Sequence, residues 1–280
     1  MATSASGFKV FICLFLLTHF SCPALADLVV QNTLPGVENN LVERQVVESK
    51  AVENSLLENR PVRLACNVFP PQKIALPSET AHPGYDIEII QQAFLAKGLT
   101  TEFGFFPWKR AYLLVESGEY DALCSCSWRP EREKTFWFSD EMGIVSKGIF
   151  SLDALSLGKL ADLREKSVGV VSGYNLEQEL KAAGFSEIQS VVSDKLLLNL
   201  LLYKRVEVIY SFENTVGALL KKMNPRPSVQ YQEVENAPYY LCISRAHKHG
   251  QQLLETFNSG LQKLKAEGHY EQIILRYLGE

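Results

Sequence analysis

The chain has 280 residues, of which 46% are hydrophobic and 21% are charged, a composition typical of a globular protein with enough apolar material for a core. Its formal net charge of −4 argues against nucleic acid or an anionic membrane as the main partner, because both repel a negatively charged surface. The composition therefore favours a small molecule as the binding partner, and we expect no nucleic-acid partner.

The N-terminus has the pattern of a secretory signal peptide. Lys9 precedes the apolar run VFICLFLL, which is too short to span a bilayer as a helix, and Ala24-Leu25-Ala26 supplies the small-x-small pattern of a cleavage site. No later apolar run is long and uncharged enough to span a membrane. We therefore predict that residues 1–26 are removed after Ala26 and that the mature protein is soluble and exported.

Residues 37–60 contain a repeat with a five-residue period, which reads VENNL, VERQV, VESKA, VENSL and LENR. Five residues advance a helix by about 500°, so successive valines point in different directions and no apolar stripe forms. An odd period also alternates between the two faces of a strand. We therefore predict that residues 27–60 form a mobile, acidic extension without a core of its own.

Four cysteines remain after the predicted cleavage, namely Cys66, Cys124, Cys126 and Cys242. Four cysteines allow three complete sets of disulfides, and the sequence does not choose among them. Cys124 and Cys126 alternate in a predicted strand and so share a face, which argues against a bond between these two. Buried free thiols are the alternative. No Cys/His spacing is typical of a metal site, and we expect neither a metal nor a cofactor.

The chain after the repeat alternates strands and helices. VRLACNVF, TTEFGFF and YDALCSCS have the composition of strands. The helix DIEIIQQAFLAKG places Ile87, Ile90 and Phe94 on one face and ends at Gly98, and Pro107 opens the next helix. This βαβαβ order predicts a parallel, doubly wound sheet.

A second α/β unit follows. KSVGVV and VEVIY are predicted strands, SGYNLEQELKAAG a turn and a helix capped by Asn175, and residues 194–203 a leucine-rich helix. APYYLCISR adds a strand, and LLETFNSGLQKLKAEG and YEQIILRYLG are two closing helices. Two such lobes can face each other across a cleft, where the carboxyl ends of the strands bind ligands.

Five stretches of the chain resemble, in the right order, the family 3 extracellular solute-binding proteins, which are periplasmic receptors of polar amino-acid ABC transporters: PGYDIEIIQQAF, PWKRAYLLVESGEYDAL, RPEREKTFWFSD, LREKSVGVVSGYN and LLETFNSGLQKLKAEGHYEQIILRY. The resemblance implies a periplasmic-binding-protein-like, type II fold with two doubly wound lobes joined by two hinge strands. Residues 61–146 and 240–280 would form one lobe and residues 147–239 the other.

The resemblance also implies ligand-binding residues. Arg132 would bind a carboxylate, for which its planar guanidinium offers a matching two-pronged donor. Ser125 and Ser127 would supply contacts at the end of a strand, and Trp108 an aromatic surface. The alternatives are ordinary: a surface ion pair for Arg132, small strand-end residues for the serines, and a place in the core for Trp108.

The turn before the helix of the second lobe suits an anion as well. Tyr174 and Asn175 lie in a turn whose free amide groups point away from the helix that follows. Together with Arg132 and the serines, this turn would let two lobes hold one acidic group.

Two positions depart from the pattern of the amino-acid binders. Arg129 stands where these proteins usually carry a threonine, and a second cation there favours ligands with more than one negative charge. The alternative is that Arg129 pairs with Glu131 or Glu133. The aspartate that holds the ligand's amino group in the family has no counterpart after VEVIY, where Glu213 lies about one position away. These departures leave open a ligand that is different from, or more acidic than, a free α-amino acid.

We predict a periplasmic protein that captures a small anionic or zwitterionic, amino-acid-like solute in an interlobe cleft for import by an ABC transporter. Its partners would be this solute and a membrane permease, and the protein would be a monomer. The chain has no Gly-x-Ser-x-Gly or HExxH motif, so we expect no enzyme. The alternatives are a dehydratase-like enzyme with Glu213 as its base and a ligand-sensing module.

Overall fold

The computed structural model describes residues 60–76, 82–154 and 159–279 of the chain. They all belong to one compact unit, Val52–Glu280. The predicted signal peptide and residues 27–59 of the predicted extension lie outside the described residues.

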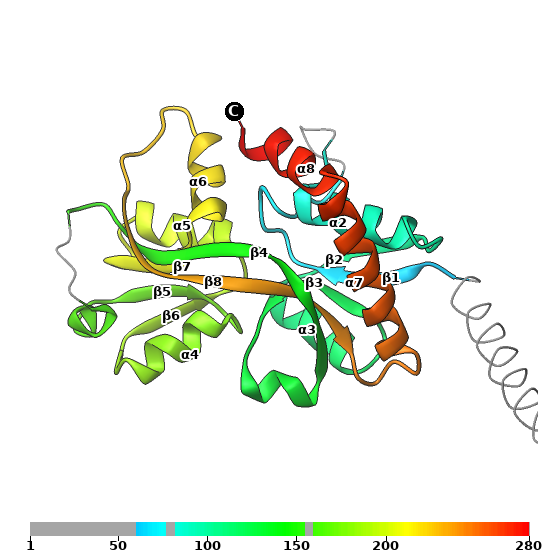
Figure 1. The fold of residues 1–280 in the computed structure, drawn as a ribbon. Helices are drawn as coiled ribbons and strands as arrows, with labels where there is room; N and C mark the ends of the chain where they lie inside the picture. The colour runs from blue at the N-terminus through cyan, green and yellow to red at the C-terminus, as the bar shows by residue number, and fades with distance from the viewer. Residues whose placement is uncertain (1–59, 77–81, 155–158, 280) are drawn as a thin grey trace, which may run out of the picture. The chain divides into compact units, whose positions relative to one another are not determined.

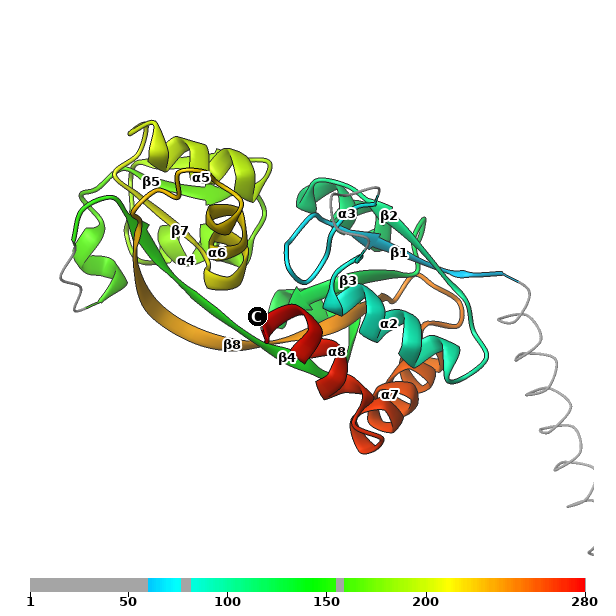
Figure 2. The same cartoon turned by 90° about the horizontal axis from the view of Figure 1, so that it is seen from above.

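The first lobe is a parallel sheet covered by helices. Its strands are β1 (Val62–Cys66), β2 (Thr101–Phe105) and β3 (Ala122–Ser127), with β1 in the middle and parallel to both neighbours. Its helices are α2 (Tyr85–Leu95), α3 (Trp108–Glu116), α7 (Gly250–Ala266) and α8 (His269–Leu278). Helices α2, α7 and α8 pack against one another on one side of this lobe (Figure 2).

The second lobe repeats this arrangement with fewer elements. Its strands are β5 (Val168–Val171), β6 (Ile188–Val191) and β7 (Val208–Phe212), with β5 parallel to both of the others. Its helices are α4 (Asn175–Ala182), α5 (Asp194–Leu202) and α6 (Glu213–Lys221). Two short 3-10 helices, η1 (Pro130–Lys134) and η2 (Leu160–Leu163), precede β4 and β5 respectively. Both lobes are therefore doubly wound α/β units, as the sequence predicts.

Two long strands join the lobes. β4 (Phe136–Ser151) and β8 (Gln230–Ser244) run antiparallel beside each other along almost their whole length (Figure 1). One end of β8 pairs with β3 and one end of β4 pairs with β7, which gives the sheet order β2-β1-β3-β8-β4-β7-β5-β6. We propose that the lobe boundaries fall at residues 146/147 and 239/240, inside these strands; the pairing of β4 with β7 from Lys147 onward supports the first of them.

The apolar faces read from the sequence form the core. Ile87, Ile90 and Phe94 of α2 are buried, and so are the apolar residues one turn apart along α7. Gly260 of α7 lies against the backbone of Ala93, where an added Cβ would collide with the carbonyl group. A glycine at this position therefore allows α7 to approach α2 closely.

The sequence reading missed or misplaced three local features. It assigned no strand to most of β4 and no helix to α6. It also predicted Asn175 as a helix cap, but the helix begins at Asn175 and its extended N-cap residue is Tyr174, without a side-chain cap bond. The Asn175 amide instead donates to Glu179 Oε1, four residues along the helix, at 2.9 Å. The side chain is thus used inside the helix rather than at its end.

All four cysteines of the described residues form disulfides in the first lobe. Cys66–Cys124 joins the neighbouring strands β1 and β3, and Cys126–Cys242 joins β3 to β8. This set is one of the three that the sequence left open, and Cys124 and Cys126 do not bond each other. The end of β3 is therefore tied covalently to both of its neighbours.

Membrane-spanning helices and metal-binding clusters are both absent from the described residues. None of their helices is long and apolar enough to cross a membrane. Within the same residues, no three His, Cys, Asp or Glu side chains lie together as a metal site would require.

Candidate functional site

A cavity lies between the two lobes, beside the carboxyl ends of β1 and β3. It offers about 50 Å³ to the centres of water-sized molecules, which is room for a few waters or one small solute. Six of the residues predicted to bind ligand line it: Trp108, Ser125, Ser127, Arg132, Tyr174 and Asn175. Whether they bind a ligand stays a prediction, but the fold brings them together.

Arg132 of η1 is buried without an ion pair among the described residues. Its side chain is 7% exposed, and Nη1 donates to the carbonyl oxygen of Ser127 at 2.9 Å. The guanidinium carbon lies 5.7 Å from the Trp108 ring and 5.8 Å from the Tyr112 ring. Burial lowers the pKa of Arg132. A buried guanidinium with most of its donors unused is chemically suited to bind an anion.

The loop after β1 places a second cation in the cavity. Phe69 and Lys73 exchange two backbone hydrogen bonds of 2.8 Å, which closes a tight loop. Lys73 is 3% exposed, donates from Nζ to Ser125 Oγ at 2.5 Å and lies 4.8 Å from the Phe69 ring. Burial lowers the pKa of Lys73 to about 8, against the opposing charges of Asp86 and Asp194.

Asp86, in the first turn of α2, is the carboxylate of the cavity wall. Gly84 lets the start of α2 approach the loop after β1, because any Cβ at its positive φ would collide with the Gln72 backbone. Tyr239 donates its hydroxyl to Asp86 Oδ1 at 2.7 Å, whereas Oδ2 has no hydrogen-bond partner among the described residues. Burial raises the pKa of Asp86 to about 6, opposed by Lys73, Tyr239 and Ser125.

Gln72 presents a complete unpaired amide to the same cavity. The side chain is 1% exposed, and neither Nε2 nor Oε1 has a hydrogen-bond partner in the described part of the chain. A buried amide left without partners costs free energy, on the order of 1–3 kcal/mol per group. Together with Asp86 Oδ2, it gives this wall polar atoms with which a polar ligand could form hydrogen bonds.

The second lobe contributes aromatic rings and an amide. Tyr174 donates its hydroxyl to Asp194 Oδ2 and accepts from Asn67 Nδ2, both at 2.9 Å. Burial raises the pKa of Asp194 to about 6, although Tyr174 and Ser211 both donate to its carboxylate. Phe212 packs edge-on against Phe69 of the first lobe, with ring centroids 5.2 Å apart. This lobe thus covers the cavity with groups that already have partners.

The remaining two predicted site residues do not line the cavity. Arg129 pairs with Glu179 of α4 rather than with Glu131 or Glu133, and so links the two lobes. Glu179 also accepts hydrogen bonds from Lys147, Tyr210 and Asn175, which makes it the centre of a polar network. Glu213 is an exposed residue at the start of α6, and its neighbour Phe212 lines the cavity instead.

The sequence reading missed several lining residues, above all Gln72, Lys73 and Asp86. It predicted a strand over VRLACNVF and did not follow the chain into the loop beyond it. Because this loop leaves the carboxyl end of a parallel strand, its polar residues were candidates for ligand contact. That topological signal was present in NVFPPQK.

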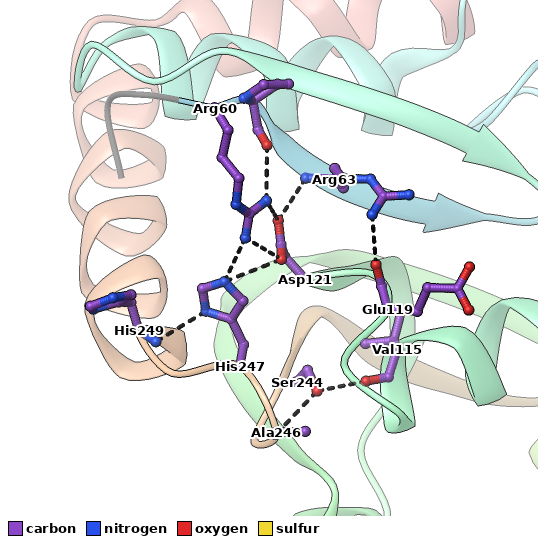
Figure 3. Close-up of polar contacts among 10 residues, drawn as sticks. Arg60, Arg63, Val115, Glu119, Asp121, Ser244, Ala246, His247 and His249 are labelled. Carbon is purple, nitrogen blue, oxygen red and sulfur yellow. Dashed lines mark hydrogen bonds and ion pairs between the residues drawn. The ribbon is translucent and has the colours of Figure 1, made fainter. Parts of the chain in front are cut away.

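A second polar cluster lies outside the cavity, at the first described residue. Figure 3 shows Arg60, Asp121 and His247 pointing toward one another: Arg60 donates twice to Asp121, at 2.7 and 2.8 Å, and His247 Nε2 lies 3.2 Å from the same carboxylate. Burial raises the pKa of Asp121, but Arg60, the Arg63 amide and His247 outweigh it and lower that pKa overall. This cluster satisfies its own charges.

The fold and the cavity define a two-lobed binding protein, and solved structures agree. A histidine kinase sensor domain with similarity to periplasmic binding proteins superposes with a TM-score of 0.72 at 21% identity, covering 79% of this chain and 97% of that chain. The arginine-, lysine-, histidine-binding protein ArtJ from Geobacillus stearothermophilus gives a TM-score of 0.69 at 18% identity, covering 79% and 96%. At these identities the likeness shows the fold, which is the predicted type II arrangement.

The chain belongs to the bacterial extracellular solute-binding proteins, family 3, which it matches over residues 63–280. It is 23% identical to a probable histidine-binding protein of Campylobacter jejuni over 69% of this chain and 76% of that one. It is 22% identical to the L-cystine-binding protein TcyA of Bacillus subtilis over 70% and 73%. The predicted family is confirmed, and the family and these relatives are binding proteins rather than enzymes.

Proposed function

We propose that this protein captures a small anionic or zwitterionic solute in the interlobe cavity and presents it to the permease of an ABC transporter. It would do so as a monomer in the periplasm, after removal of the signal peptide near Ala26. The family gives this proposal its frame, since its relatives include proteins named for binding histidine and cystine.

The observation that carries the proposal is Arg132. This guanidinium is buried at the cavity wall and has no ion pair within the described residues, while Gln72 and Asp86 add unpaired polar atoms to the same wall. Proteins rarely bury such groups unsatisfied, and a ligand carboxylate would satisfy the guanidinium with a charge-assisted bidentate bond. The second lobe would then exclude water and strengthen that bond.

Native mass spectrometry of the mature protein tests the proposal directly. The spectrum is recorded before and after denaturation and refolding, and we expect a small molecule to be present before and absent afterwards. Adding panels of amino acids and organic acids to the refolded protein should then raise its melting temperature with at least one solute. If no solute co-purifies and none stabilises the protein, capture is the wrong function. Turnover of the bound molecule would favour an enzyme.

A ligand-sensing module is the second candidate, and the likeness to a kinase sensor domain motivates it. Import and sensing use the same cavity, so ligand affinity does not separate them. Uptake of radiolabelled ligand by cells with and without the gene does: import predicts loss of high-affinity uptake, whereas sensing predicts normal uptake.

A further inference from the structure

The charges that line the cavity do not balance. Lys73 and Arg132 are both buried, and neither forms an ion pair within the described part of the chain. Asp86 is the single carboxylate of the lining. Asp194 is not part of the lining; it accepts from Tyr174 and Ser211, and its charge also acts on Lys73. With the lining groups ionised, the lining carries a net charge of +1. Because Asp86 and Asp194 both act on Lys73, Arg132 is the cation that a ligand carboxylate would neutralise.

The two cations are anchored on the same strand. Lys73 donates to the Ser125 hydroxyl, and Arg132 donates to the carbonyl oxygen of Ser127, two residues further along β3. Two residues span roughly 7 Å of a strand. Because both cations face one small cavity, they can act on a single small anion.

A ligand ammonium finds little to bind in this cavity. An ammonium group needs carboxylate or carbonyl acceptors. Glu213, the carboxylate predicted for this role, is exposed outside the cavity, and the apolar Phe212 lines the wall in its place. The lining acceptors without a partner among the described residues are Asp86 Oδ2 and the neutral Gln72 Oε1, and the Asp86 carboxylate already interacts with the charge of Lys73. An ammonium beside Asp86 would be repelled by Lys73, whereas a ligand hydroxyl could donate to Oδ2 without that cost.

We propose that the ligand is a small hydroxy acid rather than an amino acid, and that Lys73 is the residue that selects it. The carboxylate lies between Lys73 and Arg132, the ligand hydroxyl donates to Asp86 Oδ2, and the Gln72 amide binds a remaining ligand oxygen. This inference rests on the proposed function, because it names the ligand of the same cavity. The sequence predicts Arg129 as the second cation that determines ligand preference, and this inference assigns that role to Lys73 instead.

Matched pairs of solutes test this inference. L-lactate and L-alanine differ in a hydroxyl against an ammonium, and so do L-malate and L-aspartate. Isothermal titration calorimetry at pH 7 on refolded, ligand-free protein should show tighter binding of the hydroxy acid, by tenfold or more, in at least one pair. Comparison of the affinities for lactate and malate then shows whether the cavity prefers a ligand with one carboxylate or with two. Tighter or equal binding of the amino acids overturns the inference and leaves solute capture intact. Binding of none of the four overturns it too, and the co-purified molecule then decides on capture.

The Lys73→Met variant assigns the preference to its cause. It should lose tenfold or more in affinity for the hydroxy acid and little for the amino acid, so that the preference collapses. Lys97→Met is the control, because Lys97 donates to Ser259 in the same way but on the surface. It should leave both affinities unchanged. Lys73→Gln serves if the methionine variant does not fold. A preference that survives both Lys73 variants overturns the role of this residue.

Discussion

The first lobe presents to the cavity two unpaired cations, a carboxylate and a free amide, whereas the second lobe presents Tyr174, Asn175 and Phe212. The charged groups of the second lobe, Asp194 and Glu179, already have partners within the protein. Both disulfides lie in the first lobe as well, on either side of Ser125. The lobe with unsatisfied polar groups is therefore also the lobe with the more rigidly fixed backbone.

This difference indicates a division of roles. A rigid wall with unsatisfied charges can bind a ligand by itself, because its groups need no rearrangement before they bind. An aromatic cover with few free polar groups adds the exclusion of water, which strengthens the bonds made by the other wall. We therefore expect losses in the first lobe to change both affinity and preference, and losses in the second lobe to weaken closure and so to lower the affinity for all ligands by a smaller amount.

Removal of the Cys126–Cys242 disulfide should have the largest effect. This disulfide closes a loop between residues 116 positions apart in the sequence. In the chain-entropy description, closing a loop of this size contributes on the order of 4–5 kcal/mol to the free energy of unfolding. The Cys126→Ala/Cys242→Ala variant should therefore melt at a clearly lower temperature. Cys66→Ala/Cys124→Ala, with a separation of 58 residues, should lose slightly less.

Hydrogen exchange of the same variants tests whether the rigidity belongs to the first lobe. Amides of β1 and β3 should exchange faster than in the wild type, while those of β5 and β7 keep their rates. Equal acceleration in all four strands would show that the two lobes unfold as one unit, and the comparison of their rigidity would fail.

Arg132→Ala should weaken binding by about 2–5 kcal/mol, because a desolvated ligand carboxylate loses its partner. Arg110→Ala is the matched control, since this exposed arginine stacks on Phe106 outside the cavity. Asn175→Ala in the second lobe should cost about 1 kcal/mol, the value of one hydrogen bond. Calorimetry on the three variants measures how much each wall of the cavity contributes to ligand affinity. A larger loss from Asn175→Ala than from Arg132→Ala would reverse the comparison.

Much of the first lobe and the place of Arg132 at the cavity wall could be predicted from the sequence, for physical reasons. The apolar periodicity of α2 and α7 reports burial directly, and RPEREKTFWFSD resembles a family motif closely enough to place Arg132. β4 could not be read in the same way, because it crosses between two lobes and its buried and exposed residues follow no single alternation. Strands of this kind are defined by their partners rather than by their own pattern.

The choice among charged residues could not be predicted from local sequence. Arg129 and Arg132 look alike in RPEREK, yet Arg132 lines the cavity and Arg129 pairs with Glu179, which lies 50 residues away in the chain. Lys73 gives no periodic signal at all. Its position depends on the approach of Gly84 to Gln72 and on the contact with Ser125, and neither can be read from the residues beside it.

Affinity should fall as the pH rises above about 8. Lys73 binds an anion only when protonated, and its pKa is about 8, so at higher pH a proton must be taken up on binding. The carboxylates that face it, Asp86 and Asp194, have pKa values of about 6 and stay ionised above pH 7. The loss should approach tenfold per pH unit, about 1.4 kcal/mol. Titrations from about pH 7 to 9.5 measure it, and Lys73→Met should be flat. A flat wild-type profile would contradict the role of Lys73.

Arg129→Met should have a smaller and less selective effect. The Arg129–Glu179 pair joins the lobes and is partly exposed, so its loss should cost at most about 1 kcal/mol. Because the binding of every ligand depends on the closure of the two lobes, the affinities for lactate and alanine should fall by the same factor. A change in their ratio would instead return Arg129 to the ligand site, as the sequence reading had it.

Changes near the cluster around Asp121 should have the smallest effect on melting temperature and ligand affinity. Its carboxylate is paired within the protein, unlike the cations of the cavity, and the side chain of Arg60 is 47% exposed. A chain that begins at Arg60 should therefore keep the wild-type melting temperature and affinity, since the described contacts of the cavity and of this cluster are made by residues from Arg60 onward. A large loss of either would show that the extension packs on the lobes.

Arg60→Ala in that shortened chain tests the cluster itself. Burial lowers the pKa of His247, Asp121 opposes this and Arg60 adds to it, so removal of Arg60 should raise that pKa toward its ordinary value. A histidine with a lowered pKa binds fewer protons in the folded state than in the unfolded state, and it destabilises the protein as the pH falls through about 6.5. The free energy of unfolding of the wild type should exceed that of the variant by less than about 1 kcal/mol at about pH 7.5, and this difference should shrink toward about pH 5. NMR titration of the His247 ring measures the shift. An unchanged pKa would mean that the Arg60 contact does not persist in solution, and this side of the first lobe would then hold an unpaired charge like the cavity wall.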